Sequence, residues 1–172
     1  FQAVDICEIV KPVVKKSFLC KEAAQIPWVF REAFRIARDG RPGPVHIDLP
    51  QDVQQQMISY DASIDEPLPV FKTPPSPAKI RRAVELLANA ERPVLMPGGG
   101  VIIAEAWEPL VALAEHLQLA VSPTLMGKGA IDEDHPLYAG IVGIQTSQPF
   151  ANALFLESDV VCAVGARFAS RH

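Results

Sequence analysis

The residues best suited to chemistry are glycines placed where they could hold a phosphate group. Gly98, Gly99 and Gly100 directly follow a predicted buried strand and precede a predicted helix. Glycine lets the backbone approach a bound phosphate closely, and the first turn of a helix offers N–H groups without partners. The same run also fits a simple tight turn between strand and helix. A nucleotide contact and a tight turn both remain open at this position.

The glycine run lacks the fingerprint of a nicotinamide dinucleotide site. That fingerprint needs a third glycine at position 103, where the sequence has Ile103. It also needs an acidic residue at the end of the next strand to bind the ribose hydroxyls, and the predicted strand at 119–123 has none. A redox dehydrogenase therefore ranks last among the functions considered.

Two further glycine-bearing loops follow predicted strands. Residues 124–127 (TLMG) come after the second strand of the pattern, and residues 165–171 (GARFASR) come after the third. In a doubly wound sheet, the loops after the carboxyl ends of the strands converge on one crevice. Arg167 and Arg171 would add planar donors suited to bidentate phosphate binding, although lone arginines are more often simply solvated.

The other titratable groups indicate no catalytic site. His46 lies inside a predicted strand, where a packed or half-exposed side chain is the simpler interpretation. The acidic segment at 132–135 is interpreted as a solvated turn rather than a cation site. Cys7, Cys20 and Cys162 show neither disulfide nor metal spacing. We therefore predict no catalytic residue and no metal ligand in this chain.

The elements that would position these loops alternate between helices and strands. Apolar residues spaced by three and four predict a helix from Ile26 to Arg38, ended by Gly40. Further helices are predicted at 78–90, 103–117 and 148–157, and strands at 44–50, 93–97, 119–123 and 159–164. This alternation predicts an α/β fold, a parallel sheet flanked by helices with a Rossmann-like arrangement.

Five prolines between residues 67 and 77 divide the pattern. Each proline lacks an N–H and fixes φ, so this stretch can form neither a helix interior nor a central strand. We predict an interdomain linker at 54–77, between part of one α/β domain at 1–53 and an incomplete second domain at 78–172. A long surface loop within one domain is the alternative.

Composition narrows the class of protein. The chain has 172 residues, 49% of them apolar, and a net charge of −4, which favours neither nucleic acid nor an anionic membrane. No apolar run approaches the roughly 18 residues of a spanning helix, and no signal peptide opens the sequence. We expect a cytoplasmic protein. Because the sequence starts without methionine and stops beside a predicted binding loop, we also expect an internal fragment.

Motifs along the whole chain resemble those of thiamine-diphosphate-dependent enzymes. Residues 1–5 (FQAVD), Lys11-Pro12 and 40–53 (GRPGPVHIDLPQDV) look like the end of their pyrimidine-binding domain. The second half looks like their central domain. It resembles the acetohydroxyacid synthase branch, and within it the glyoxylate carboligases, at residues 66–70 (EPLPV), 97–100 (PGGG), 123–127 (PTLMG), 140–146 (GIVGIQT) and 167–172 (RFASRH).

The resemblance implies an activity and its cofactors. Enzymes of this kind, also called tartronate-semialdehyde synthases, join two glyoxylate molecules with loss of CO₂, using thiamine diphosphate and Mg²⁺. Their central domain holds FAD without using it for redox chemistry. By motif, FAD contacts are expected at Gly98, Gly99, Gly100, Thr124, Leu125, Met126, Gly143, Gln145, Gly165, Arg167 and Arg171.

The same resemblance places the activating glutamate and the Mg²⁺–diphosphate motif in other parts of the parent enzyme, which is expected to be a homo-oligomer. We therefore predict that this polypeptide alone is inactive as a carboligase. Two alternatives stay open, an acetolactate synthase large subunit acting on pyruvate and a non-catalytic nucleotide-binding module.

Overall fold

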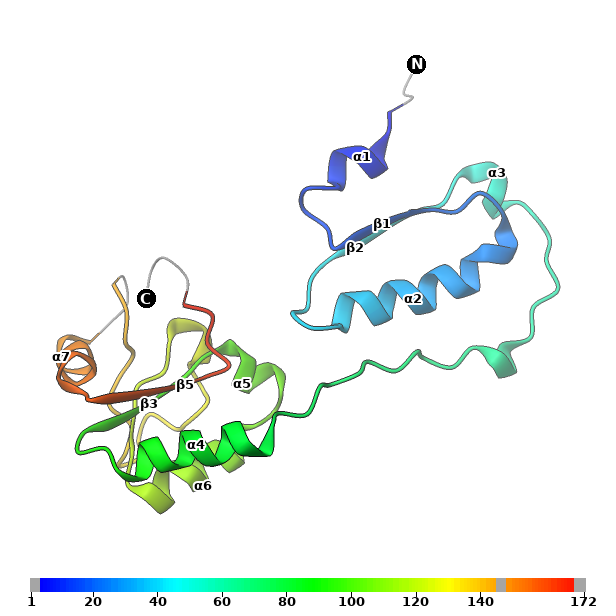
Figure 1. The fold of residues 1–172 in the computed structure, drawn as a ribbon. Coiled ribbons are helices and arrows are strands. Elements are labelled where there is room, and N and C mark those ends of the chain that lie inside the picture. Colours follow the sequence, from blue (N-terminus) through cyan, green and yellow to red (C-terminus); the bar gives the residue numbers. More distant parts are fainter. Residues whose placement is uncertain (1–3, 145–147, 169–172) are drawn as a thin grey trace. The chain divides into compact units, whose positions relative to one another are not determined.

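The computed structural model describes residues 4–144 and 148–168, and the chain forms two compact units, Phe1–Pro74 and Pro75–His172 (Figure 1). Among the described residues the longest helix has 13 residues, and none is long and apolar enough to cross a lipid bilayer. Each unit contains a parallel sheet with helices packed on it, so the predicted α/β fold is confirmed.

The first unit is built on two parallel strands, β1 (Lys16–Leu19) and β2 (Val45–Asp48). Helix α2 (Ile26–Arg38) connects them and lies along the sheet (Figure 1). A small core of four buried residues forms between these elements, namely Cys20, Ala23, Val29 and Val53. The remaining elements are short: helices α1 (Ile6–Val10) and α3 (Gln51–Gln54), and 3₁₀ turns at Ala23–Gln25 and Ala62–Ile64.

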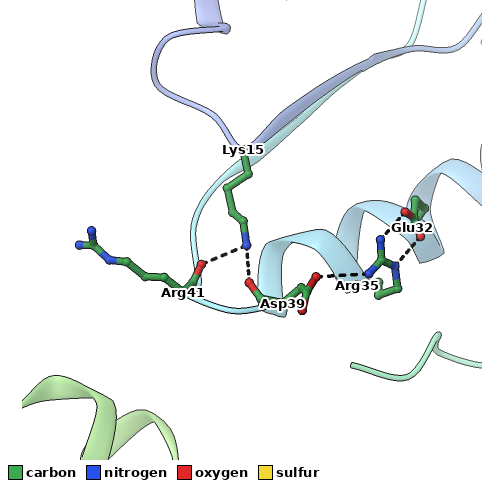
Figure 2. Close-up of polar contacts among 5 residues, drawn as sticks. All are labelled: Lys15, Glu32, Arg35, Asp39 and Arg41. Carbon is green, nitrogen blue, oxygen red and sulfur yellow. Dashed lines mark hydrogen bonds and ion pairs between the residues drawn. The ribbon is translucent and has the colours of Figure 1, made fainter. Parts of the chain in front are cut away.

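A lysine fixes the chain where α2 ends and the path turns toward β2 (Figure 2). The Lys15 ammonium donates hydrogen bonds to the carbonyl oxygens of Asp39 and Arg41, the latter at 3.0 Å. Carbonyls just beyond a helix lack intrahelical partners and carry partial negative charge, so a cation is favourable there. Gly40 takes φ +55° between the two acceptors, as expected for a glycine that follows a helix.

The second unit is built on three parallel strands in the spatial order β4–β3–β5. They are β3 (Pro93–Pro97), β4 (Ala120–Val121) and β5 (Val160–Val164). Tyr138 adds a parallel bridge to Val121 on the outer side of β4. The chain thus runs outward from β3 to β4 to Tyr138, then returns to place β5 on the other side of β3. Between β3 and β5 the strand order reverses, which is where open α/β sheets bind ligands.

Helices cover this sheet from both sides. Leu95, Val121 and Cys162 are register partners and so share one face of the sheet. That face packs against Leu87 of α4 (Pro77–Ala88) and Leu110 of α6 (Trp107–Leu117) in a single hydrophobic cluster. Figure 1 shows α4 and α6 together below the strands, with α7 (Pro149–Glu157) apart from them on the other side.

The structure corrects three details of the predicted elements. The helix predicted at 103–117 begins only at Trp107, as α6, and a separate short helix, α5 (Gly99–Ile103), precedes it across a turn in which Glu105 takes φ +53°. The second strand is only Ala120–Val121. The apolar spacing within 78–90 predicts that Ile80 and Val84 face inward, but on α4 they are 47% and 45% exposed, because α4 packs on the outermost strand β5 and buries only Leu87.

A carboxylate ties together the amino ends of β3 and β5. Asp159 accepts hydrogen bonds from the backbone N–H of Glu91 at 2.7 Å and of Arg92 at 2.9 Å. The Arg92 guanidinium donates to the carbonyl oxygen of Glu157 at 2.8 Å. The Glu91 and Arg92 N–H bonds lower the pKa of Asp159, since they favour its charged form.

Because its folded pKa is depressed, Asp159 stabilises the second unit above the carboxyl pKa of the unfolded chain, about 4. That contribution is lost as the pH falls through the lower folded value. We expect Asp159→Asn to lower the urea midpoint of unfolding at pH 7, and to lower it by less at about pH 3, below the carboxyl pKa of the unfolded chain. Asp134→Asn is the matched control, since only the backbone N–H of Asp134 is hydrogen-bonded, to the Asp132 carboxylate, and no described residue contacts the Asp134 side chain. An equal difference at both pH values would contradict the assignment.

Replacing Lys15 by methionine keeps its apolar stem and removes both hydrogen bonds to the α2 terminus. We expect Lys15→Met to lower the free energy of unfolding of the first unit by about 1 kcal/mol. Lys21→Met, at an exposed lysine without a described side-chain contact, should change it by less than about 0.5 kcal/mol. Equal effects of the two substitutions, measured by urea unfolding, would rule out the capping role.

Candidate nucleotide-binding site

Three loops meet at the carboxyl ends of the strands in the second unit. The N–H of Gly98, after β3, donates to the carbonyl of Val164 at 2.8 Å, and the N–H of Gly100 donates to Gly165 at 3.0 Å. From the loop after β4, the N–H of Thr124 donates to Pro97 at 2.9 Å. The sequence placed these loops on one crevice, and the structure joins them by backbone hydrogen bonds at the point where the strand order reverses.

Glycine is required here because the loops after β3 and β5 touch through their backbones. A Cβ on Gly98 would lie 2.5 Å from the carbonyl oxygen of Gly165 and 2.6 Å from the Cα of Ala166. One on Gly100 would lie 2.7 Å from the Cα of Gly165. Gly165 itself takes φ +63°, a conformation that other residues adopt at a cost. The tight-turn interpretation thus accounts for Gly98 and Gly100, whose N–H groups are already used.

The loop after β4 is a capped 3₁₀ turn, Leu125–Gly127. The buried Thr124 hydroxyl accepts a hydrogen bond from the N–H of Gly127 at 3.2 Å. Gly127 packs on the carbonyl of Pro97, where no side chain would fit. This turn leaves Leu125 and Met126 projecting, 51% and 71% exposed, with Met126 against Gly99.

Gly143 comes to the same end of the sheet by a different route. The preceding Val142 donates its N–H to the carbonyl of Pro123 at 3.0 Å, directly after β4. The Asn152 side chain of α7 then brackets Gly143, accepting from its N–H at 3.1 Å and donating to its carbonyl at 2.9 Å. Two other predicted contacts, Gln145 and Arg171, lie outside the described residues.

Donors without protein partners collect on two of the loops. Within the part of the chain that the structure describes, no hydrogen bond engages the backbone N–H of Gly99, Ala166 or Arg167. The Arg167 side chain is exposed and forms no ion pair with any described residue. Unpaired N–H groups beside a guanidinium suit a phosphate anion. Helix α5 has only five residues, so its dipole adds little to this donor set.

Other polar clusters are engaged in local structure. In the acidic turn, Glu133 pairs with Lys128 at 2.9 Å and His135 contacts Glu115 at 3.3 Å. The ring Nδ1 of His135 also accepts from the N–H of Leu137 at 3.2 Å. Across residues 4–144 and 148–168, no group of three or more His, Cys, Asp or Glu side chains could hold a metal ion.

A groove of about 530 Å³ lies elsewhere on the second unit. Its lining includes Gln118 and Ala120 at the start of β4, together with Phe150 and Leu154 of α7. The start of β4 is the opposite end of the sheet from Gly98 and Gly165. This groove is therefore separate from the converging loops at the carboxyl ends of the strands.

Comparison with known proteins identifies the family. Residues 80–172 match the family model described as "Thiamine pyrophosphate enzyme, central domain". The chain belongs to this family. It is 52% identical over its full length to the "Glyoxylate carboligase" of Escherichia coli O157:H7, of which it covers 29%.

Two further relatives are archaeal proteins named "Probable acetolactate synthase large subunit". The chain is 46% identical to that of Methanocaldococcus jannaschii and 44% identical to that of Methanococcus aeolicus, with 99% of this chain aligned to each. It covers 30% and 29% of their lengths. The resemblance to thiamine-diphosphate enzymes of the acetohydroxyacid synthase branch is thus confirmed. The chain spans under a third of these relatives.

Two residues of the converging loops were not among the contacts predicted from the sequence. Gly127 was part of a quoted motif but not a predicted contact, although a glycine three residues after Thr124 is a recognisable capped-turn signal. Phe168 was also missed, and it takes φ +49° with its ring 61% exposed. No feature of the sequence predicts a positive φ at a phenylalanine.

The packing role of the glycines can be separated from their conformational role. Gly98 has a negative φ, so Gly98→Ala adds only the clash with the β5 loop, and we expect a loss of about 3 kcal/mol in unfolding free energy. Gly129 takes φ +88° with open space around it, so Gly129→Ala should cost only about 1 kcal/mol. Urea unfolding of both variants tests this order, and the reverse order would show that the two loops can separate at little cost.

Proposed function

We propose that this chain forms part of a thiamine-diphosphate-dependent carboligase that joins two glyoxylate molecules to tartronate semialdehyde and releases CO₂. The observation that carries the proposal is 52% identity to a glyoxylate carboligase across all 172 residues. Identity to the acetolactate synthases named above is lower, at 46% and 44%. The motifs at 123–127 and 140–146 lie within the segment matched to the central domain.

The role proposed for the second unit is to bind FAD at the three converging loops. Arg167 and the unpaired N–H groups of Gly99 and Ala166 would hold the phosphates. The exposed side chains of Leu125 and Met126 would cover an apolar ring of the ligand. Gly143, Gln145 and Arg171 remain proposed contacts by motif, and Gly98 and Gly100 contribute by letting the loops meet.

The chemistry of the proposed reaction would come from the cofactor of the whole enzyme. Thiamine diphosphate supplies an electron sink for decarboxylation of a 2-oxo acid when it is bound. Mg²⁺ would anchor its diphosphate group. The residues of this chain would bind and orient FAD, and we assign them no proton transfer, since the described residues of the three strand-end loops include no general acid or base.

We further expect the enzyme to work in the cytoplasm as a homo-oligomer. Large apolar side chains on α2 support association, since Trp28 is 53% exposed and Phe34 is 66% exposed.

An acetolactate synthase acting on pyruvate is the second candidate, supported by the 46% identity to the protein from Methanocaldococcus jannaschii. The test uses the intact gene product supplied with thiamine diphosphate, Mg²⁺ and FAD, and compares CO₂ release from glyoxylate and from pyruvate. We expect faster release from glyoxylate, with tartronate semialdehyde as the product. Preference for pyruvate would transfer the enzyme to the second candidate, and no release from either would contradict both.

A flavin titration tests the FAD site separately from catalysis. We expect Arg167→Ala to weaken FAD binding roughly tenfold or more, because a hydrogen bond to a charged phosphate is lost. Arg81→Ala, at an exposed arginine on α4, is the control and should leave affinity unchanged. FAD affinity equal in wild type and Arg167→Ala would refute the assignment of this side chain.

A further inference from the structure

Phe168 combines two unfavourable features at one residue. Its backbone takes φ +49°, in the left-handed region where a side chain with a Cβ is strained. Its ring is 61% exposed to solvent, which forgoes the gain of burying an aromatic side chain. Strain of this kind persists where surrounding structure enforces it and is concentrated at ligand sites.

The position of Phe168 relates this strain to the converging loops. Ala166, two residues earlier, lies against Gly98, and Gly165 is hydrogen-bonded to Gly100. Figure 1 shows the segment after β5 leaving the sheet beside α5. The tight contact through Gly98 and Gly165 fixes the start of this segment, so the backbone that carries Phe168 leaves the sheet from a fixed position.

The ring also has no described partner of its own. Among residues 4–144 and 148–168, the one aromatic pair is Phe18 with Trp28, and the one cation–π contact is Lys16 over Phe18. Phe168 thus presents a ring without an aromatic or cationic partner among the described residues, and it directly follows Ala166 and Arg167 in the sequence, whose backbone N–H groups have no described partner. A nucleotide site combines hydrogen-bond donors, which bind the phosphates, with an aromatic ring on which the base stacks.

We propose that Phe168 is an aromatic platform on which a planar heteroaromatic ring of the bound nucleotide stacks. This inference rests on the proposed function of the second unit as a nucleotide site. It adds a ring-binding residue that motif comparison did not predict. Adenine and the flavin ring share the stacking chemistry, so the test separates them with ligands that contain one ring each.

The experiment measures binding of FAD, FMN and ADP to the full chain by titration calorimetry, for wild type, Phe168→Ala and Phe168→Trp. We expect Phe168→Ala to bind FAD about tenfold more weakly, the order expected for loss of one stacking contact. Phe168→Trp keeps a stacking face and should bind within about twofold of wild type. The same loss with ADP but not FMN identifies adenine as the stacked ring, and the reverse identifies the flavin.

Two controls separate stacking from folding. Leu156→Ala removes an apolar side chain that is 83% exposed near the start of β5, at the other end of the strand, and should leave affinity unchanged. Phe168→Gly removes both the ring and the backbone strain, so we expect weak binding together with an unfolding temperature at or above that of wild type.

The outcomes distinguish this inference from the proposed function. Wild-type FAD affinity retained in both Phe168→Ala and Phe168→Gly would overturn the platform while leaving the nucleotide site in place. Failure of the wild-type chain to bind FAD, FMN and ADP would overturn the nucleotide site and the platform with it. A loss of affinity in Phe168→Trp as large as in Phe168→Ala would also overturn stacking, since both tryptophan and phenylalanine offer an aromatic face.

Discussion

The backbone contact between the loops after β3 and β5 is the constraint on which the second unit depends. Gly98 and Gly100 face Gly165 with no room for a Cβ on any of the three. This contact closes the sheet at its carboxyl end and sets the direction in which both loops leave it. The N–H groups of Gly98 and Gly100 are used in this loop contact, whereas that of Gly99, between them, has no partner among the described residues.

The opposite end of the same sheet is fixed by charge instead of by close backbone packing. Asp159 accepts hydrogen bonds from the backbone N–H groups of Glu91 and Arg92, just before β3. The Arg92 side chain donates a hydrogen bond to the carbonyl of Glu157, just before β5. The first unit uses a similar device, with Lys15 holding the carbonyls after α2. In both units, short strands of two to five residues are held by specific bonds at their ends. Strands this short form few hydrogen bonds with neighbouring strands and gain little stability from them.

The sequence predicted best those elements that glycine or proline bounds. Helix α2 has the predicted bounds because its apolar spacing is regular and Gly40 follows it, and β3 lies between prolines. Strand β1 was missed because its four residues mix charged, polar and apolar types. The exposure of Ile80 could not be predicted, since it depends on α4 packing over the outermost strand. The sequence indicated which loops meet, but the reason for each glycine required knowing what lay opposite it.

The loop after β4 differs from the corresponding loop of a nicotinamide dinucleotide site. In such a site, a carboxylate at the end of the second strand binds the ribose hydroxyls. Here Ser122 and Thr124 are buried, and the Thr124 hydroxyl is occupied by the N–H of Gly127. The side chains that the turn presents to solvent, Leu125 and Met126, are apolar. In the proposed FAD site, such a loop would contact the rings and phosphates of the ligand rather than its ribose hydroxyls.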